Sequence, residues 1–461
     1  MLSYALLYML PLFVAVAMLA LLSRSKRMAF MLSSLMLVAE TAIAAHLVLV
    51  GADIVLFGAF HIYAFSALFA ALFSFVLLLV NILTYRYSAD YSDDLFMLGL
   101  VLGGAVIVPA ATSLLMLLVS LELVAVPMAF TMLLAGRHRA EAATKFLILG
   151  AVSIAAFSFA MVLIFPYDAQ LGVSLLGSNA GIAGSALIML ALVLFVLALG
   201  FGAEIFPFDL WVPDVYDGAP SYAVAALASV NKGVAFVVLL ELLFVVFAAQ
   251  KAMFSSMAML LSVLTMFFGN LIALTQKSVK RMLAYSSISQ AGYILIGFAA
   301  ASQFGIEASI FQLIAHSFMI VGAFAIVLWL ESVNLKTVSD YGGLSRRNRF
   351  AAFSLTLIML SMAGIPPLMG FVGKFLLFSS AIDSGALLLA ALGILSSLIS
   401  VLCYAKVISA MYSATDHAKL RTDRAVAVVA VVALAIVVVF GIYPQPVITA
   451  AQLASKALLG I

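Results

Sequence analysis

The sequence predicts an all-α polytopic membrane protein with about fourteen transmembrane helices, ten of which form two inverted five-helix repeats. Three observations lead to this fold class. The 461-residue chain is 67% hydrophobic and only 9% charged, whereas about a quarter of the residues in a soluble domain are charged. Long apolar runs alternate with short polar loops, and lysine and arginine gather in every second loop. No aqueous fold could bury this much apolar surface, so the bilayer must surround most of the chain.

Fourteen segments are apolar enough to cross a membrane. A transmembrane helix needs about 20 mostly apolar residues, and the loops between the segments are too short for a soluble domain. The first segment is longer than a signal-peptide core and its basic cluster follows it, so we expect a retained helix. The predicted helices are 2–22, 28–50, 62–84, 95–111, 113–135, 142–165, 183–206, 219–248, 253–275, 283–301, 308–331, 350–381, 385–414 and 424–443.

The basic residues predict the orientation of these helices. If the N-terminus lies outside, the loops after odd-numbered helices are cytoplasmic, and the outer loops hold only Lys251 and Lys456. The cytoplasmic basic residues are Arg24, Lys26, Arg27, Arg86, Arg137, Arg139, Lys277, Lys280, Arg281, Lys336, Arg346, Arg347, Arg349, Lys419, Arg421 and Arg424. By the positive-inside rule, we expect both termini outside. The net charge of +3 is too small to indicate nucleic acid as a partner.

Two predicted helices are interrupted, and their positions indicate an internal repeat. The seventh runs into EIFPFDLWVP (204–213), and the twelfth contains GIPP (364–367). Proline removes a backbone donor and clashes with the preceding turn. Breaks five helices apart predict repeats of helices 4–8 and 9–13, and an odd repeat length makes them inverted. The predicted parts are an N-terminal three-helix segment (1–94), repeat one (95–248), repeat two (253–414), and helix 14 with a short tail (415–461).

Acidic and basic side chains lie inside helices five to seven. Glu122 is in the middle of the fifth helix, Lys145 lies in the sixth near a basic loop, and Glu204 precedes the first break. A charge at the centre of a bilayer costs at least ~3 kcal/mol. A glutamate and a lysine that interact can switch between paired and neutral states when a proton arrives, so Glu122 is a candidate relay. The alternatives are a static salt bridge for Glu122 and snorkelling to the interface for Lys145.

The eighth, eleventh and twelfth helices each carry a basic side chain. Lys232 has about ten apolar residues on either side, as for a mid-membrane group, and lies beside Asn231, a polar patch that suits bound water. Lys374 follows the glycine-rich break, and His316 lies mid-helix. All three are candidates for a proton path, and for His316 the alternative is a packing role. For the remaining buried or border groups we expect packing or interface roles: Glu40, His46, Glu241 and Lys406.

Several kinds of chemistry are excluded. Cys403 is the only cysteine, which excludes an iron–sulfur cluster, a thiolate zinc site and an intramolecular disulfide. The loop residues Asp209, Asp214 and Asp217 do not have the spacing of a known metal motif. The sequence has no catalytic triad and no nucleotide fingerprint. We therefore expect ion or proton movement, with no cofactor and no metal in this chain.

Long motifs of the chain resemble the antiporter-like membrane subunits of respiratory complex I, most closely subunit N. The motif PFDLWVPDVYDGAPSYAVAALASVNKGVAF (207–236) is similar to their signature, and GNLIALTQKSVKRMLAYSSISQAGYILIG (269–297) and SMAGIPPLMGFVGKF (361–375) match the same subunit. LELVAVPMAF (121–130) and RHRAEAATKFLILGA (137–151) are also similar. The resemblance covers most of helices 5–13. The family also includes subunits of cation/proton antiporters and membrane-bound hydrogenases.

The resemblance implies fourteen helices, the inverted repeats and a water-filled polar axis across the middle of the membrane. The family's glutamate of helix 5 corresponds to Glu122, and its lysines of helices 6, 8 and 12 correspond to Lys145, Lys232 and Lys374. The sequence departs from the family at two positions. The stretch before the first break lacks the usual helix-7 lysine and has Glu204 nearby, and His316 replaces a tyrosine that is more usual in subunit N. Either Lys232 substitutes for the missing partner of Glu122, or the coupling of this subunit is altered.

The first hypothesis is a proton-translocating membrane-arm subunit of a complex I-like oxidoreductase, driven by redox chemistry in other subunits. The resemblance implies other membrane subunits as partners, including sister antiporter-like subunits, together with the lipid bilayer. We expect the inner (plasma) membrane of a prokaryote as the location. The alternatives are a subunit of a multisubunit cation/proton antiporter or membrane-bound hydrogenase, and a structural subunit with impaired pumping.

Overall fold

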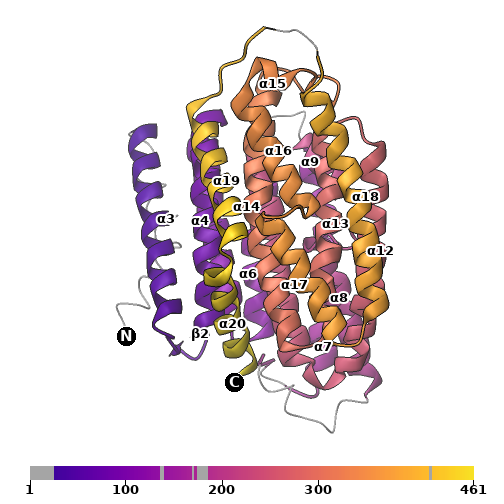
Figure 1. The fold of residues 1–461 in the computed structure, drawn as a ribbon. Helices are drawn as coiled ribbons and strands as arrows, with labels where there is room; N and C mark the ends of the chain where they lie inside the picture. The colour runs from indigo at the N-terminus through magenta and orange to yellow at the C-terminus, as the bar shows by residue number, and fades with distance from the viewer. Residues whose placement is uncertain (1–24, 135–139, 169–170, 174–184, 415–417) are drawn as a thin grey trace. The chain divides into compact units, whose positions relative to one another are not determined.

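A computed structural model of the chain describes residues 25–134, 140–168, 171–173, 185–414 and 418–461. This part is almost entirely helical, as predicted (Figure 1). Within it, eleven helical segments are long and apolar enough to cross a membrane, and α8 (Ala186–Gly202) and α16 (Arg349–Ala363) are shorter apolar helices. The predicted helix 2–22 lies outside the described residues, so the count of fourteen stays a prediction.

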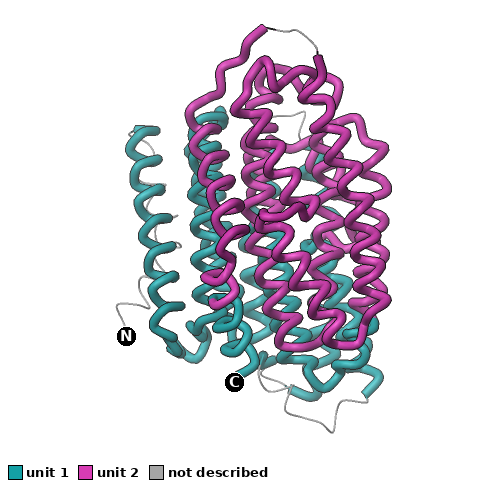
Figure 2. The backbone as a smooth tube through the Cα atoms, viewed as in Figure 1, with its two compact units in different colours: residues 1–203, 230–256, 450–461 teal, residues 204–229, 257–449 magenta. Residues whose placement is uncertain are grey.

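The chain divides into two compact units, which Figure 2 shows in different colours. Unit 1 comprises Met1–Ala203, Val230–Ser256 and Ala450–Ile461, and unit 2 comprises Glu204–Ser229 and Met257–Thr449. These units are defined by packing, and their boundaries differ from those of the predicted repeats, because residues 204–229 belong to unit 2. The inverted repeats therefore stay a prediction.

Unit 1 contains the first described helices and a small hairpin. Its helical elements, besides α8, are α3 (Lys26–Leu49), α4 (Ala64–Tyr87), α5 (Tyr91–Ile107), η1 (Val108–Ala110), α6 (Leu114–Leu134), α7 (Ala140–Ile164), α11 (Lys232–Glu241), η5 (Leu242–Val246) and η6 (Ala248–Gln250). The strands β1 (Ile54–Leu56) and β2 (Phe60–Ile62) pair antiparallel. The sequence analysis predicted only a loop here. The hairpin forms because Phe57 and Gly58 both adopt positive φ in the turn.

Unit 2 contains most of the remaining helices. Its elements, besides α16, are α9 (Val212–Gly218), α10 (Ser221–Ala226), α13 (Val279–Ala300), α14 (Gln303–Ser332), α15 (Leu344–Arg347), α17 (Met369–Asp383), α18 (Leu387–Met411) and α19 (Arg424–Ile442). Three elements include residues of both units: η4 (Leu227–Asn231), α12 (Lys251–Thr275) and α20 (Gln445–Leu459).

Both predicted helix breaks are present. Helix α8 ends at Gly202, and helical structure resumes at Val212, after the first of the two prolines of this segment. Helix α16 ends at Ala363, and α17 begins at Met369 after two prolines. Gly364 caps α16 in the left-handed region, with φ of 88°, where a residue without Cβ is favoured. Each break leaves carbonyl groups at a helix end that need partners.

The predicted helix 219–248 is not a uniform α-helix. It consists of α10, the π-helical segment η4, α11 and a second π-helical segment, η5. A π-turn adds a residue to the turn and shifts the side chains that follow it, and such turns often occur at functional sites. The sequence pattern did not reveal these segments because an apolar run has the same composition in either helix type.

Helices α13 and α14 are the most deeply buried spans of unit 2. For α14 this follows from an apolar surface on all sides. Helix α13 differs, because it has the lowest mean hydropathy of the described candidate spans and still buries nearly all of its residues. Its serine, glutamine and tyrosine side chains must therefore find hydrogen-bond partners inside the protein.

Glycines allow α12 and α13 to approach closely within unit 2. A Cβ atom added at Gly269 would lie 2.6 Å from the backbone nitrogen of Ser289 and the carbonyl oxygen of Tyr285. One added at Gly292 would lie 2.6 Å from the backbone nitrogen of Met266. Small residues at helix contacts allow backbones to approach closely inside membranes, and here the contacted atoms are backbone atoms that cannot rotate away.

We expect Gly269→Ala to destabilise the protein by about 1–3 kcal/mol, because the new methyl group overpacks a backbone contact. The measurement is the thermal unfolding midpoint of the purified protein in detergent. The control is Gly150→Ala, since a Cβ at that helical glycine would lie 3.6 Å from the ring of Phe201, an ordinary contact. Equal midpoints for the two variants would show that the α12–α13 contact is looser than described.

Candidate functional site

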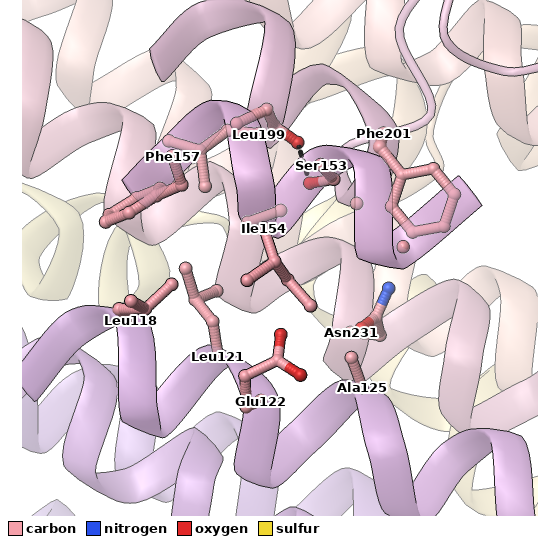
Figure 3. Close-up of a pocket in the computed structure, with 14 residues that line it drawn as sticks. Leu118, Leu121, Glu122, Ala125, Ser153, Ile154, Phe157, Leu199, Phe201 and Asn231 are labelled. Atoms are coloured by element: carbon pink, nitrogen blue, oxygen red, sulfur yellow. Dashed lines mark hydrogen bonds between the residues drawn. The ribbon is translucent and has the colours of Figure 1, made fainter. Parts of the chain in front are cut away.

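In unit 1, Glu122 lies beside a cavity lined by residues of α6, α7, α8, η4 and α11 (Figure 3). Most of the lining is apolar, and three polar side chains contribute to it, those of Glu122, Ser153 and Asn231. Figure 3 shows the carboxyl group of Glu122 pointing toward the part of the cavity where Ile154 and Asn231 lie. The predicted relay acid therefore faces an internal space and an amide group.

The size and polarity of this cavity suit a few water molecules. Its volume is about 50 Å³, and a buried water needs roughly 10–15 Å³ together with two to four polar partners. The hydroxyl of Ser153 donates to the carbonyl of Ala198 over 2.6 Å, and its oxygen can still accept. In the described structure, no ion pair of at most 4.0 Å joins Glu122 to a lysine.

Lys232 is the first residue of α11 and directly follows η4. The residue is only 1% exposed. Its neighbour Gly233 packs tightly within unit 1, because a Cβ there would lie 2.6 Å from the ring of Phe73 in α4. Asn231, and not Lys232, contributes to the lining of the cavity beside Glu122. The expected partnership of Glu122 and Lys232 stays a prediction.

In unit 2, the hydroxyl of Ser287 lies between Glu204 and His316. Ser287 Oγ donates to Glu204 Oε2 over 2.6 Å, and His316 Nε2 lies 3.5 Å from the same hydroxyl oxygen. The phenol of Tyr216 donates to Glu204 Oε1 over 2.5 Å. These four side chains come from the first break and from α9, α13 and α14, and all are buried. The structure thus brings together two predicted residues that are more than a hundred positions apart in the chain.

The backbone of Glu204 is in the left-handed region, with φ of 60°. Glu204 directly follows Ala203, the C-cap residue of α8. Glycine is usual at this position after a helix. A residue with Cβ costs about 1–2 kcal/mol in this conformation, and the two hydrogen bonds to its carboxyl group offset part of this cost. The backbone conformation at this position favours glycine and does not explain a glutamate. The hydrogen bonds of its side chain do.

Lys374 is buried at the second break and is 3% exposed. Its Nζ donates to the carbonyl oxygen of Ala363 over 3.1 Å and to Ser397 Oγ over 2.9 Å. The same Nζ lies 4.3 Å from the centre of the Tyr293 ring. Ala363 is the last residue of α16, so its carbonyl belongs to the negative end of a helix dipole. The break thus supplies a carbonyl that binds the ammonium group.

Glycines leave the space that this lysine occupies. A Cβ at Gly364 would lie 3.0 Å from Lys374 Cδ, and one at Gly373 would lie 1.9 Å from Gln312 Oε1. A Cβ at Gly370 would lie 2.0 Å from the carbonyl oxygen of Ser361. The glycine-rich break therefore has a specific role, because it lets polar side chains approach the backbone closely.

Helix α13 contributes a row of polar side chains that the sequence analysis did not single out. Gln312 Nε2 donates to Gln290 Oε1 over 2.9 Å, and Gln290 Nε2 donates to the carbonyl of Met362 over 3.1 Å. Tyr293 accepts a hydrogen bond from Asn270 Nδ2 over 3.0 Å. The signal was present, since Ser287, Gln290 and Tyr293 follow the spacing of one helix face. An uncharged polar side chain is a weaker signal than a charge in an apolar run, so this row was not predicted.

Lys145 has different surroundings. Its Nζ lies 2.9 Å from Glu141 Oε1, one turn earlier in α7, and the two side chains are 40% and 78% exposed. Lys145 does not contribute to the cavity lining beside Glu122. These surroundings agree with the snorkelling alternative of the sequence analysis, and a relay role for Lys145 stays a prediction.

The six predicted residues thus fall into separate groups. Unit 1 holds Glu122 with its cavity, Lys232 and the half-exposed Lys145; unit 2 holds the Glu204–His316 cluster and Lys374. Across the described ranges, no group of three or more His, Cys, Asp or Glu side chains could hold a metal ion. The single polar axis through all of these groups stays a prediction.

Known proteins are similar to this chain along most of its length. The family described as "NADH:quinone oxidoreductase/Mrp antiporter, TM" matches residues 111–400. F(420)H(2) dehydrogenase subunit N of Methanosarcina mazei is 34% identical over 86% of this chain and 84% of its own length. NADH-quinone oxidoreductase subunit N of Trichlorobacter lovleyi is 36% identical over 77% of this chain and 75% of its own length.

One solved structure extends the similarity to three dimensions. A chain of respiratory complex I from Thermus thermophilus is 26% identical and matches with a TM-score of 0.82. The match covers 96% of this chain and 98% of that chain. The predicted resemblance and the predicted fold class, a multi-pass helical membrane protein, are confirmed.

We expect Gly364→Ala to destabilise the protein more than Gly385→Ala does. Both glycines have positive φ, 88° and 84°, so both changes carry a penalty of about 1–2 kcal/mol. A Cβ at Gly385 meets nothing within 4 Å, whereas one at Gly364 presses on Lys374. The thermal unfolding midpoint of each variant measures the difference. Equal losses would mean that the lysine side chain does not depend on the space beside the break.

Proposed function

Because the chain belongs to the family of NADH:quinone oxidoreductase and Mrp antiporter transmembrane proteins, we propose that it is a proton-translocating membrane-arm subunit of a complex I-like oxidoreductase. Redox chemistry takes place in other subunits, and this chain moves protons through buried acidic and basic groups. Its partners are other membrane subunits of that assembly, including sister antiporter-like subunits. The chain needs no cofactor of its own for this task.

The observation that carries the proposal is the environment of Lys374. A buried lysine can carry a proton, or a fixed counterion can hold it in one charge state. In the described part of the chain, Lys374 forms no ion pair with a carboxylate, and its polar contacts are a carbonyl oxygen, a hydroxyl and an aromatic face. A buried cation that lacks a fixed counterion is sensitive to any charge that arrives nearby. This favours a group that binds and releases a proton.

Ser397 makes both protonation states of Lys374 tolerable. When the lysine is an ammonium group, Nζ donates to Ser397 Oγ and to the carbonyl of Ala363. The hydroxyl of Ser397 lies 3.2 Å from that same carbonyl and donates to it. When the lysine is a neutral amine, the hydroxyl can rotate and donate to the amine nitrogen. A single hydroxyl thus exchanges one hydrogen bond for another as the proton leaves, and no buried polar group loses its partner.

The cluster around Glu204 supports proton transfer by a second hydroxyl. Ser287 contacts the carboxyl group of Glu204 on one side and the imidazole of His316 on the other. A hydroxyl can accept a proton from one neighbour while it donates its own to the other, and histidine can carry the result. We propose that Glu204 acts here in a chain that lacks the helix-7 lysine of its family. It fixes the hydroxyl and exchanges a proton with His316.

Glu122 contributes a third proton-binding group, in unit 1. Its carboxyl group faces a cavity with room for water, Ser153 and Asn231. Water in such a cavity can deliver a proton over distances that side chains cannot bridge. We propose that Lys232, which is buried next to Asn231, responds to the charge of Glu122, and that Lys145 supports the same path from its place near the start of α7.

We retain the orientation that the basic residues predict. Both termini then lie outside the inner (plasma) membrane of a prokaryote, and the Lys336 to Arg349 segment lies on the cytoplasmic side.

We expect Lys374→Ala and Lys374→Arg to slow proton transfer through this subunit in the assembled complex by at least about 100-fold, because a positioned proton carrier contributes that much. Arginine keeps the charge but does not release its proton, so it separates proton transfer from assembly. Proton translocation per electron in vesicles is the measurement. Lys406→Ala is the control, since Lys406 is exposed and donates only to the carbonyls of Leu274 and Gln276. An unchanged ratio in both Lys374 variants would refute the role.

We expect Ser287→Ala to reduce proton translocation and Ser287→Thr to restore it, because threonine keeps the hydroxyl between Glu204 and His316. Ser289→Ala is the matched control, since Ser289 is also buried in α13 and only donates to the carbonyl of Ser286. The same vesicle measurement applies. If Ser287→Ala behaves like Ser289→Ala, the hydroxyl is not part of the path.

The family description also names Mrp antiporters, so a subunit of a cation/proton antiporter is the second candidate function. Sodium-driven pH changes in vesicles without an electron donor would favour it over the first. A scaffold role would be favoured by normal assembly and pumping after replacement of both Lys232 and Lys374.

A further inference from the structure

Glu40 lies in the middle of α3 and is buried in unit 1. The residue is 2% exposed, and neither of its carboxyl oxygens has a hydrogen-bond partner in the described structure. The sequence analysis expected a packing or interface role for this residue. Burial of a carboxylate without a donor is very costly, whereas a glutamine or methionine would fill the same space. Packing alone therefore does not explain an acid at this position.

The surroundings of Glu40 contain hydroxyl groups. Glu40 lies on the buried face of α3, together with Leu37 and Ala44, and α3 packs against α4. The next residue, Thr41, forms a hydrogen bond of 2.9 Å with Ser74 of α4. Both hydroxyls also contact carbonyls of their own helices. The acid therefore lies at the contact of two helices, one residue before a hydrogen-bonded pair of uncharged side chains.

A second polar cluster lies on the same helix face, nearer the Lys26 end of α3. Tyr91 OH donates to Asn81 Oδ1 over 2.9 Å, and Asn81 Nδ2 donates to Ser33 Oγ over 3.0 Å. Lys26 Nζ lies 5.5 Å from the centre of the Tyr91 ring. Ser33 precedes Glu40 by seven residues, which is two turns and about 10 Å along the helix. The cluster therefore connects the charged end of α3 to a point two turns from the acid.

Other titratable groups lie toward both ends of α3. At the Lys26 end, the elements packed against α3 present Tyr85 and Arg86 from α4 and Tyr91, Asp93 and Asp94 from α5, and α3 itself adds Lys26 and Arg27. His46 lies in the last turn, at the opposite end of α3. None of them is joined to Glu40 by a hydrogen bond or an ion pair in the described ranges. Glu40 has no fixed counterion there, so it is electrically neutral only when it holds a proton.

We propose that Glu40 is a further proton-binding site, which exchanges its proton with the Lys26 end of α3 through the hydroxyls of Tyr91 and Ser33. Their oxygens lie 3.4 Å apart, and Asn81 holds both hydroxyls in place by its own hydrogen bonds. The carboxylate accepts one proton from a hydronium ion, an O–H bond forms at Glu40, and water remains. Water between the two clusters carries the proton over the last two turns. The neutral acid brings its own donor and can bond to the hydroxyl oxygens nearby. The claim that this proton takes part in translocation rests on the proposed function. The claim that Glu40 binds a proton does not.

Infrared difference spectroscopy of the assembled complex between acidic and alkaline buffer tests the binding. The wild type is expected to show a carboxylic-acid component from Glu40 beside those of other acids such as Glu122. This component is lost in Glu40→Gln and shifted but present in Glu40→Asp. Asp93→Asn is the control, because Asp93 is an exposed acid of α5 and its loss should leave the buried band unchanged. A Glu40→Gln spectrum identical to that of the wild type would overturn the proposal.

Proton translocation per electron tests the use of the site. Glu40→Gln, which preserves size, should assemble normally and lower the ratio, and Glu40→Asp should restore most of it. If Glu40→Gln keeps the wild-type ratio while the Lys374 variants lose it, the proposed function stands and this further use of Glu40 is wrong. If the infrared band is lost but the Lys374 variants pump normally, proton binding at Glu40 stands and the proposed function fails.

Discussion

Much of this structure follows from one constraint, which is that polar groups inside an apolar interior must find their partners within the protein. Lys374 shows how the constraint is met. Its ammonium group would be costly in hydrocarbon, and the break between α16 and α17 exposes the carbonyl of Ala363 to receive it. The broken helix and the buried lysine therefore explain each other. The break supplies an acceptor that an intact helix would use internally, and the lysine satisfies an acceptor that would otherwise be buried alone.

Hydroxyl groups are the second means by which the constraint is met. Ser287 and Ser397 each lie between a titratable group and another polar atom. A serine both donates and accepts, so it can serve a neighbour in either protonation state. A fixed counterion would stabilise one charge state and oppose the other. A hydroxyl partner, by contrast, can form a hydrogen bond with either state. This is the property that a group needs if it is to load and release a proton repeatedly.

The buried acids of the two units have different hydrogen-bond partners. In unit 2, Glu204 accepts hydrogen bonds from Tyr216 and Ser287. In unit 1, Glu122 faces a cavity and Glu40 has no donor in the described structure. These two acids depend on water or on a bound proton for their stability. Of the proposed proton-binding groups, Glu204 is therefore surrounded by fixed donors, whereas Glu122 and Glu40 have exchangeable partners.

Much of this could be predicted from the sequence. Composition and apolar runs determined the helical membrane fold, because the bilayer imposes a length and an apolar surface on every span. The proline and glycine segments determined both breaks, and isolated charges in apolar runs pointed to Glu122, Lys232 and Lys374. The tertiary structure alone decided which groups meet. Ser287 joins Glu204 to His316 across more than a hundred residues, the π-turn η4 precedes Lys232, and Glu40 has no donor among the residues that the structure describes. A one-dimensional pattern records polarity and spacing, whereas these features depend on how separate helices pack.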